Sequence, residues 1–492
     1  MNLIPDEVKP CGSYYCTWHH QNKVMRKYGI PDEHGSGSRD ALSMKYLFDE
    51  ENDYHWLPAE DRKGVWLVLD DGWDVAYGTK NNGRASRRFF GSVEPDPGKF
   101  GELGDTPLER LKALDRLAKE HGYAGLGLWI APQVCGEIED SPMDVSEEYW
   151  ISRAKLCAEA GVRYWKVDWG YRSNDTQYRR MMTKVVKQYA PDLMIEHAYI
   201  QKPIMLPGEE ETRREFSCAA FALGDVFRTY DIMWPLPEST TLSRLHEVLE
   251  AHPKPEYGAR QIPNAEYRYF IAAGLGCAVG VMDETIHAVA TLRWQRIAPP
   301  FGAGETDYRF SYDEFLTDRF FFPKNAVSYL EYAGKELIET APAVMARGCN
   351  LPAVVPVGAE KPYVCCSQNP RTGAYAIATV RRTVDPNALI IAPAHITWHI
   401  GDPDAPVGVF GYMESLTLVY LRPLKKDARF YAQNLADREA VDITDEVTVF
   451  DNYVTIPGRT MYRVGAFNYE YPNLTADRKI DDPMLVIRII GA

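Results

Sequence analysis

The sequence contains no continuous apolar segment of 18 residues, and its first ten residues, MNLIPDEVKP, have no basic stretch followed by an apolar one. We therefore expect neither a transmembrane helix nor a signal peptide. The nine cysteines are an odd number at irregular spacing in a chain of 492 residues, which indicates free thiols in a reducing compartment. These absences predict a cytoplasmic protein, with a secreted or periplasmic protein trimmed of its signal left open.

Motifs for metals, dinucleotides and phosphates are also missing. There is no Cys-x-x-Cys or His-Glu-x-x-His, the pair His19-His20 is too little for a metal site, and no Gly-rich loop follows the first strands. We therefore expect no metal and no cofactor. Basic residues are in deficit, since 55 Lys and Arg face 69 Asp and Glu for a net charge of −14. This balance argues against nucleic acid or an anionic membrane as a partner, while a homo-oligomer stays open.

Apolar strands and amphipathic helices alternate along most of the N-terminal half. The predicted strands are Gly12–Trp18, Gly64–Leu69, Gly125–Ile130, Gly161–Gly170, Asp192–His197, Gly224–Tyr230 and Ala278–Met282. Helices are expected between them; Thr106 opens one, with Pro107 at its first position and Glu109 completing a capping box. Continuous apolar strands separated by helices predict an α/β fold, a (β/α)8 TIM barrel. A doubly wound sheet is the weaker alternative, because the Gly-rich loop is missing.

The pattern changes near residue 345. Residues 312–339 still have a helical pattern, but beyond Arg347 short β-prone segments follow one another, separated by turns such as Pro457-Gly458, with no helix-length pattern between them. We therefore predict two domains: a catalytic barrel over residues 1–345 and a C-terminal antiparallel β-sandwich over residues 346–492.

The segment Gly161–Gly170, GVRYWKVDWG, places a cation and a carboxylate on a buried strand. Because side chains alternate along a strand, Lys166 and Asp168 face the same side. Two charged groups on an interior face are costly unless they pair or open to solvent, and the C-terminal mouth of a barrel strand offers that opening. A catalytic pair and a structural ion pair are both compatible with this segment alone.

Polar residues recur at the C-terminal ends of the other predicted strands. They are Trp18, Asp70, Asp71, Trp129, Glu196, His197, Arg228, Asp231 and Asp283. Carboxylates that meet at one end of a barrel repel one another unless cations or a substrate intervene. Carboxylate acceptors for vicinal hydroxyls, together with aromatic plates for C–H faces, are what a sugar requires. We therefore predict a glycoside or oligosaccharide as the partner.

Two carboxylates on different strands suggest glycoside hydrolysis, which needs one ionised and one protonated group. Asp168 lies beside Lys166, whose charge favours the ionised form that a nucleophile needs. Asp231 lies among apolar and aromatic neighbours in residues 230–234, surroundings that raise the pKa of a carboxyl group and suit the acid. Arg228 could orient Asp231 or bind the substrate.

These motifs resemble those of the clan D glycoside hydrolases, in particular the α-galactosidase/α-N-acetylgalactosaminidase family, through most of residues 10–285. Gly12–Trp18 is similar to the family's first strand, which ends in a sugar-stacking Trp, and residues 69–73 are similar to its double-Asp motif. Tyr164–Asp168 resembles its Lys-x-Asp nucleophile motif, and residues 227–232 its Arg…Asp-Ile acid/base segment. The β module after about residue 350 is similar in placement to the family's C-terminal sandwich.

The resemblance implies a retaining exo-hydrolase for terminal α-linked galactose-like sugars. Asp168 would be the nucleophile and Asp231 the acid/base. Glu196 would accept from a free 2-hydroxyl, and the two aspartates from the 4- and 6-hydroxyls. The substrate-binding residues that we predict are Trp18, Asp70, Asp71, Trp129, Lys166, Glu196 and Arg228.

The chain also departs from the family pattern. Trp169-Gly170 follow the nucleophile where the family usually has a Cys, His197 replaces a usual Trp, and residues 125–133 are closer to a sister α-galactosidase family. The clan and mechanism are therefore better supported than the sugar. A β-L-arabinopyranoside or an α-N-acetylgalactosaminide as substrate, a transglycosylase, and a non-catalytic carbohydrate-binding protein remain alternatives.

Overall fold

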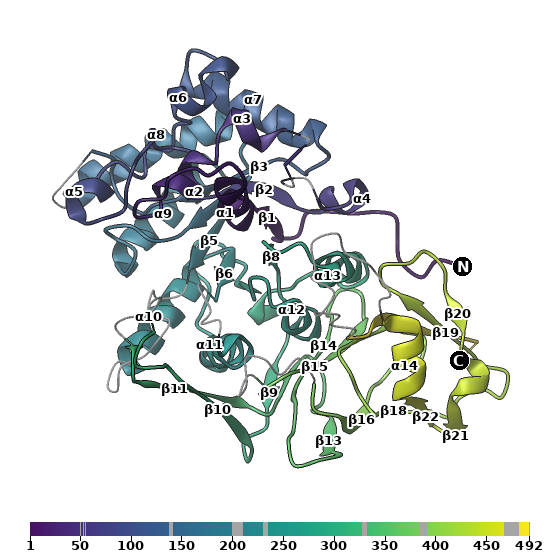
Figure 1. Cartoon of the computed structure of the whole chain (residues 1–492). Helices are drawn as coiled ribbons and strands as arrows, with labels where there is room; N and C mark the ends of the chain where they lie inside the picture. Colours follow the sequence, from purple (N-terminus) through teal and green to yellow (C-terminus); the bar gives the residue numbers. More distant parts are fainter. Residues whose placement is uncertain are drawn as a thin grey trace.

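The N-terminal part of the chain forms a parallel barrel (Figure 1). A computed structural model describes residues 1–49, 51–52, 54, 56–136, 141–198, 210–229, 235–326, 332–382, 391–466 and 482–491. Its eight-stranded sheet contains β1 (Tyr14–Cys16), β2 (Trp66–Leu69), β3 (Leu126–Ile130), β4 (Tyr164–Val167), β5 (Met194–Ala198), β6 (Val226–Arg228), β7 (Ile262–Asn264) and β8 (Gly280–Val281). Consecutive strands pair in parallel from β1 to β7, and β1 also pairs with β8.

The barrel closes between β7 and the chain that enters β8. A parallel bridge joins Asn264 to Ala278, and the Ala278 amide donates to the Pro263 carbonyl over 2.8 Å. Gly280 allows a close approach on the other side of β8, because a Cβ there would lie 2.8 Å from the Tyr14 ring. The closure confirms the predicted (β/α)8 barrel and not the doubly wound sheet.

Helices follow the barrel strands. They are α1 (Trp18–Lys27), α2 (Ser36–Asp40), α3 (Met44–Leu47), α4 (Ala59–Arg62), α5 (Arg84–Arg87), α6 (Pro97–Phe100), α7 (Pro107–Glu120), α8 (Met143–Ala160), α9 (Thr176–Tyr189), α10 (Glu210–Leu223), α11 (Pro237–Ala251), α12 (Tyr269–Leu275) and α13 (Ile286–Ile297). The predicted capping box of α7 is present, since the Glu109 amide donates to Thr106 and the Glu109 carboxylate accepts from the Thr106 amide. The interior of the barrel is filled by a cluster of side chains that includes Tyr14, Val68 and Tyr164.

Two sheets form the C-terminal module, one of eight strands and one of five. Outside the barrel the strands are β9 (Tyr308–Phe310), β10 (Phe315–Phe321), β11 (Glu336–Pro342), β12 (Val344–Arg347), β13 (Ala353–Pro356), β14 (Tyr363–Gln368), β15 (Tyr375–Val380), β16 (Ala394–His399), β17 (Val407–Phe410), β18 (Ser415–Val419), β19 (Arg429–Asn434), β20 (Val441–Asp442), β21 (Thr448–Phe450), β22 (Tyr453–Pro457) and β23 (Met484–Ile490). Most pairs are antiparallel, as predicted, but β12–β14, β15–β17 and β16–β18 are parallel.

Two local predictions are wrong. Within residues 312–339, expected to be helical, β10 and β11 form an antiparallel pair, in which exposure alternates with the period of a strand and Leu337 is buried. The helix α14 (Gly458–Gly465) interrupts the module that was expected to be all-β. The boundary at residue 345 stays a prediction, although β9 already pairs with β12 in the second eight-stranded sheet.

The barrel and the C-terminal module are packed together. Gly274 of α12 lies against β14 and β15, where an added Cβ would come within 2.9 Å of Cys365 and Ala378. The start of the chain is also bound to this module: the Leu3 amide donates to Gln433 over 2.5 Å, and the Ala440 amide donates to the Met1 carbonyl. Both chain ends lie on that side in Figure 1. Within the described ranges, no helix has the length and apolar character needed to cross a bilayer.

Candidate active site

Charged side chains from several strands meet at the C-terminal end of the barrel. They line a pocket of about 450 Å³. Its charged lining residues include Arg39, Asp70, Asp71, Lys166, Asp168, Arg228 and Glu266, each at most 5% exposed. The structure thus brings together residues as far apart in the sequence as Arg39 and Glu266, because the strands of a parallel barrel end at one face.

Asp168 lies between two cations. Its Oδ2 accepts from Arg228 Nη2 over 2.8 Å and lies 3.7 Å from Lys166 Nζ, while its Oδ1 accepts from the Trp169 amide over 2.7 Å. Neighbouring positive charge favours an ionised carboxylate, the state in which it can act as a nucleophile. Asp168 and Lys166 face the same side of the strand, as the sequence predicts.

Lys166 links the nucleophile candidate to the double-Asp segment. Its ammonium group donates to Asp70 Oδ2 over 2.6 Å, and Cys16 Sγ lies 3.0 Å from the same oxygen. Burial opposes the charged form, but Asp70 prevails and raises the pKa of Lys166 above its ordinary value. Lys166 is therefore a fixed positive charge between two carboxylates.

The two adjacent aspartates point to different partners, as expected for neighbouring residues at a strand end. Asp70 pairs with Lys166, whereas Asp71 accepts two bonds from the Arg39 guanidinium, over 2.9 and 2.7 Å. The chain turns into the following loop at Gly72, which has a φ of 122°. Gly72 also lies close to Arg39, because a Cβ on Gly72 would be 2.7 Å from the Cα of Arg39. The pocket therefore presents two carboxylates at different places on its wall.

Aromatic rings form the wall beside Arg39. Trp129 and Trp169 lie edge to face with centroids 5.2 Å apart, and Phe90 lies 4.9 Å from Trp169. The Arg39 guanidinium is 5.0 Å from the Phe90 ring. Trp129 lines the pocket from the end of β3, and Trp18 lines it from the first turn of α1 rather than from a strand end. Such rings can stack on the C–H face of a sugar.

Glu196 and His197 lie away from the pocket surface. Glu196 is fully buried and accepts from Tyr14, Tyr164, Asn264 and Arg228 over 2.8–3.2 Å, so it lies beneath the pocket. Burial raises the pKa of Glu196, against the opposing effect of Arg228. His197 is held by Arg179 and Thr183, and burial lowers its pKa, so it is a neutral structural group.

Four residues that line the pocket carried no signal in the sequence: Arg39, Trp169, Tyr267 and Glu266. Glu266 follows β7, and the Pro-containing segment IPN gave no strand signal. Glu266 has a left-handed backbone with φ of 48°, is 1% exposed, and places Oε1 2.6 Å from Arg228 Nη1. A charged residue in a strained backbone conformation next to an arginine is typical of a functional site. The predicted acid/base, Asp231, lies outside the described residues.

The pocket has more negative than positive groups among the described residues. Three cations, Lys166, Arg39 and Arg228, face the four carboxylates Asp70, Asp71, Asp168 and Glu266, and a fifth carboxylate, Glu196, is buried beneath them. Burial raises the pKa of Asp71 as it does that of Glu196. Four carboxylates on the wall of a small pocket favour a ligand with many hydroxyl donors. No cluster of three or more His, Cys, Asp or Glu with the geometry to hold a metal ion occurs in the part of the chain that the structure describes.

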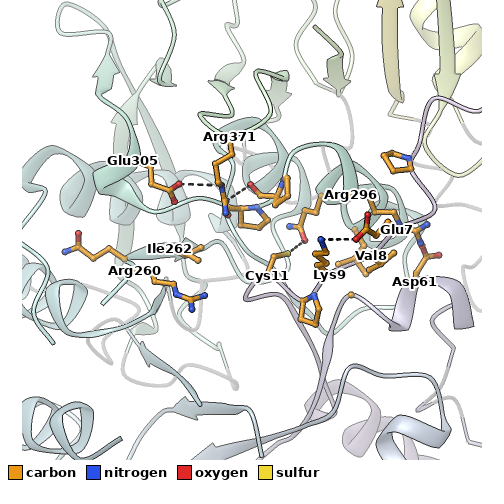
Figure 2. A pocket seen from close by; sticks show the side chains of 18 of the residues that line it. Glu7, Val8, Lys9, Cys11, Asp61, Arg260, Ile262, Arg296, Glu305 and Arg371 are labelled. Carbon is orange, nitrogen blue, oxygen red and sulfur yellow. Dashed lines mark hydrogen bonds and ion pairs between the residues drawn. The ribbon is translucent and has the colours of Figure 1, made fainter. Parts of the chain in front are cut away.

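A larger pocket, of about 870 Å³, lies at the opposite, N-terminal end of the barrel (Figure 2). Its lining comes from chain that precedes or starts strands, such as Cys11 before β1 and Ile262 at the start of β7. Figure 2 shows two ion pairs on its wall, Arg371 with Glu305 and Lys9 with Glu7. No lining residue contributes a buried polar atom that lacks a partner among the described residues. Nothing there indicates catalysis.

No family model matches the chain, and no curated protein sequence is detectably similar to it. Similar solved structures include a β-L-arabinopyranosidase from Geobacillus stearothermophilus in complex with arabinose, at 10% identity and TM-score 0.39 over 99% of this chain and 97% of that one. Others are an α-galactosidase from Saccharomyces cerevisiae with raffinose (8%, 0.39, 98% of each chain) and an Anoxybacillus α-amylase (9%, 0.42, 97% of each). The first two are of the kind that the sequence resembles. At these TM-scores the likeness carries no argument about the site.

Proposed function

We propose that the protein is a retaining glycoside hydrolase that removes a terminal α-linked galactose-like sugar. Asp168 is the nucleophile and Asp231 the acid/base. The observation that carries this proposal is the placement of Asp168 on a pocket wall between Arg228 and Lys166, among further carboxylates and aromatic rings. A carboxylate held by two cations can attack an anomeric carbon and later leave it.

Each neighbouring group has a role that its contacts support. Lys166 and Arg228 keep Asp168 charged and orient it, and Asp70 and Asp71 accept from sugar hydroxyls. Trp18 and Trp129 exclude water and stack on the sugar ring. Glu196, which is buried beneath the pocket, holds Arg228 in place through Nε.

The sugar follows from the two aspartates. An axial 4-hydroxyl and a 6-hydroxyl satisfy Asp70 and Asp71, whereas an equatorial 4-hydroxyl leaves one carboxylate without its donor. A site built to bind a hydroxyl rejects a substrate lacking it by up to about 10⁴-fold. We therefore propose that α-galactosides are preferred over α-glucosides by a wide margin.

The test is a screen of aryl α- and β-glycosides of galactose, N-acetylgalactosamine, glucose and arabinopyranose. Hydrolysis of the α-galactoside is expected, and proton NMR of the first-formed sugar should show the anomer of the substrate. The inverted anomer would exclude the glycosyl-enzyme route. Binding of sugars without turnover of any substrate would instead indicate a carbohydrate-binding protein. Rapid transfer of the sugar to an added sugar acceptor would indicate a transglycosylase.

A further inference from the structure

Glu266 occupies an unusual position at the end of β7. Its φ of 48° lies in the left-handed region, which side chains other than glycine, Asn and Asp rarely adopt. The Asn264 side chain holds this conformation, because its Oδ1 accepts from the Glu266 amide over 2.8 Å. The same Asn264 donates through Nδ2 to Glu196. The local backbone therefore fixes where the Glu266 carboxylate lies.

One oxygen of this carboxylate is used and the other is not. Oε1 accepts from Arg228 Nη1 over 2.6 Å. Oε2 is buried and has no hydrogen-bond partner among the described residues. Of the described residues that line the pocket, Glu266 is the one with such an atom. A buried acceptor without a donor calls for an explanation, and at the wall of a pocket a donor on a bound ligand supplies one.

Glu196 differs from Glu266 both in the hydrogen bonds of its carboxylate and in its position relative to the pocket. Its two oxygens already accept from four donors, it is fully buried, and it does not line the pocket. A sugar hydroxyl could reach Glu196 only by displacing one of these bonds. Glu266 can accept a hydroxyl at no such cost.

We propose that Glu266, rather than Glu196, accepts the hydroxyl on the carbon next to the reacting carbon of the sugar. This inference rests on the proposed function. Arg228 contacts both Asp168 Oδ2 and Glu266 Oε1, so the two carboxylates share one guanidinium, and a sugar whose reacting carbon meets Asp168 has the adjacent ring position toward Glu266. Of the two ring neighbours of an anomeric carbon, the ring oxygen has no proton to donate and C2 carries a hydroxyl. Bonds to the 2-hydroxyl strengthen in the transition state of glycoside hydrolysis.

The test compares an aryl α-galactoside with its 2-deoxy analogue, in the wild type, E266Q and E196Q. For each enzyme we take the ratio of kcat/KM for the two substrates, and comparing these ratios cancels the greater intrinsic reactivity of 2-deoxy glycosides. E266Q should favour the parent substrate about 10²-fold less than the wild type does, because the carboxylate that distinguishes the substrates is gone. E196Q should lose activity on both substrates and keep the wild-type ratio.

Two results would overturn the inference: an unchanged ratio in E266Q, with or without an equal loss of activity on both substrates, or a ratio that collapses in E196Q instead. Thermal unfolding of each variant shows whether it is folded. If the wild type hydrolyses no glycoside, the proposed function fails and the inference is tested by binding instead. Calorimetric titration should then show that galactose binds more tightly than 2-deoxygalactose to the wild type, and that the two bind equally to E266Q.

Discussion

Each end of the barrel carries a pocket, and the smaller of the two pockets is the one that carries the candidate site. The N-terminal pocket has about 870 Å³ and is lined by four cations and three carboxylates, whereas the C-terminal pocket has about 450 Å³ and is lined by four carboxylates and three cations. The smaller pocket also contains the buried acceptor Glu266 Oε2. The comparison teaches that the sign of the charge excess and the buried acceptor, and not the volume, distinguish the end that carries the candidate site. Each prediction below alters one group at one of these ends.

The largest effect is expected for D168N at the C-terminal end. A neutral amide cannot form the glycosyl-enzyme, so kcat should fall by about 10⁴-fold or more. The fold should be retained, because Asn preserves the shape of the side chain. Steady-state kinetics together with a thermal melt measure both quantities. Hydrolysis at near wild-type rate would remove Asp168 from the mechanism.

The matched carboxylate-to-amide change at the N-terminal end is D61N. Asp61 is buried and accepts from Arg293 over 3.1–3.2 Å and from Arg296. Removing one member of a buried ion pair typically costs about 3–5 kcal/mol of unfolding free energy. Denaturant titration should show this loss, while kcat of the folded fraction stays at the wild-type value. A loss of kcat without a loss of stability would contradict the division between the two ends.

A pH-dependent effect is expected at Asp74, in the loop after β2. Burial, with Asp71 adding to it, raises the pKa of Asp74 to about 7. A raised folded-state pKa gives stability that is present below the unfolded value, about 4, and is lost as pH rises through 7. D74N has no such titration. The unfolding free energy of D74N relative to that of the wild type should therefore be about 2 kcal/mol higher at pH 8 than at pH 5. Parallel denaturation curves at the two pH values would contradict this.

The smallest effect is expected for R39K. Lysine keeps the positive charge beside Asp71 but loses the paired hydrogen bonds and the flat contact with Phe90. Asp71 is then oriented less well for the substrate, and KM should rise about 10-fold, or about 1.4 kcal/mol, with little change in kcat. A change confined to kcat would place Arg39 in the chemical step instead.

Much of the barrel and part of the site could be predicted because they depend on local patterns. The apolar strands, the capping box at Thr106 and the motifs around Asp70 and Asp168 are all carried by adjacent residues. β7 could not be predicted, since it has only three residues and one of them is Pro263. Glu266 owes its place to β7, Asn264 and Arg228 together, so no local signal marks it. The β10–β11 pair was missed because phenylalanine and leucine suit a helix as well as a strand.

The hydrogen bonds between the first residues and the C-terminal module can form only late in the synthesis of the chain. Leu3 finds Gln433, and Met1 finds Ala440, only after those residues have left the ribosome. At about 5–20 residues per second this takes about 20–90 s, during which the opening segment has no native partner. The edge of β1 likewise waits for Gly280 and Val281. The nascent barrel therefore exposes an unpaired strand edge for much of translation. During this time the edge is available for binding by chaperones.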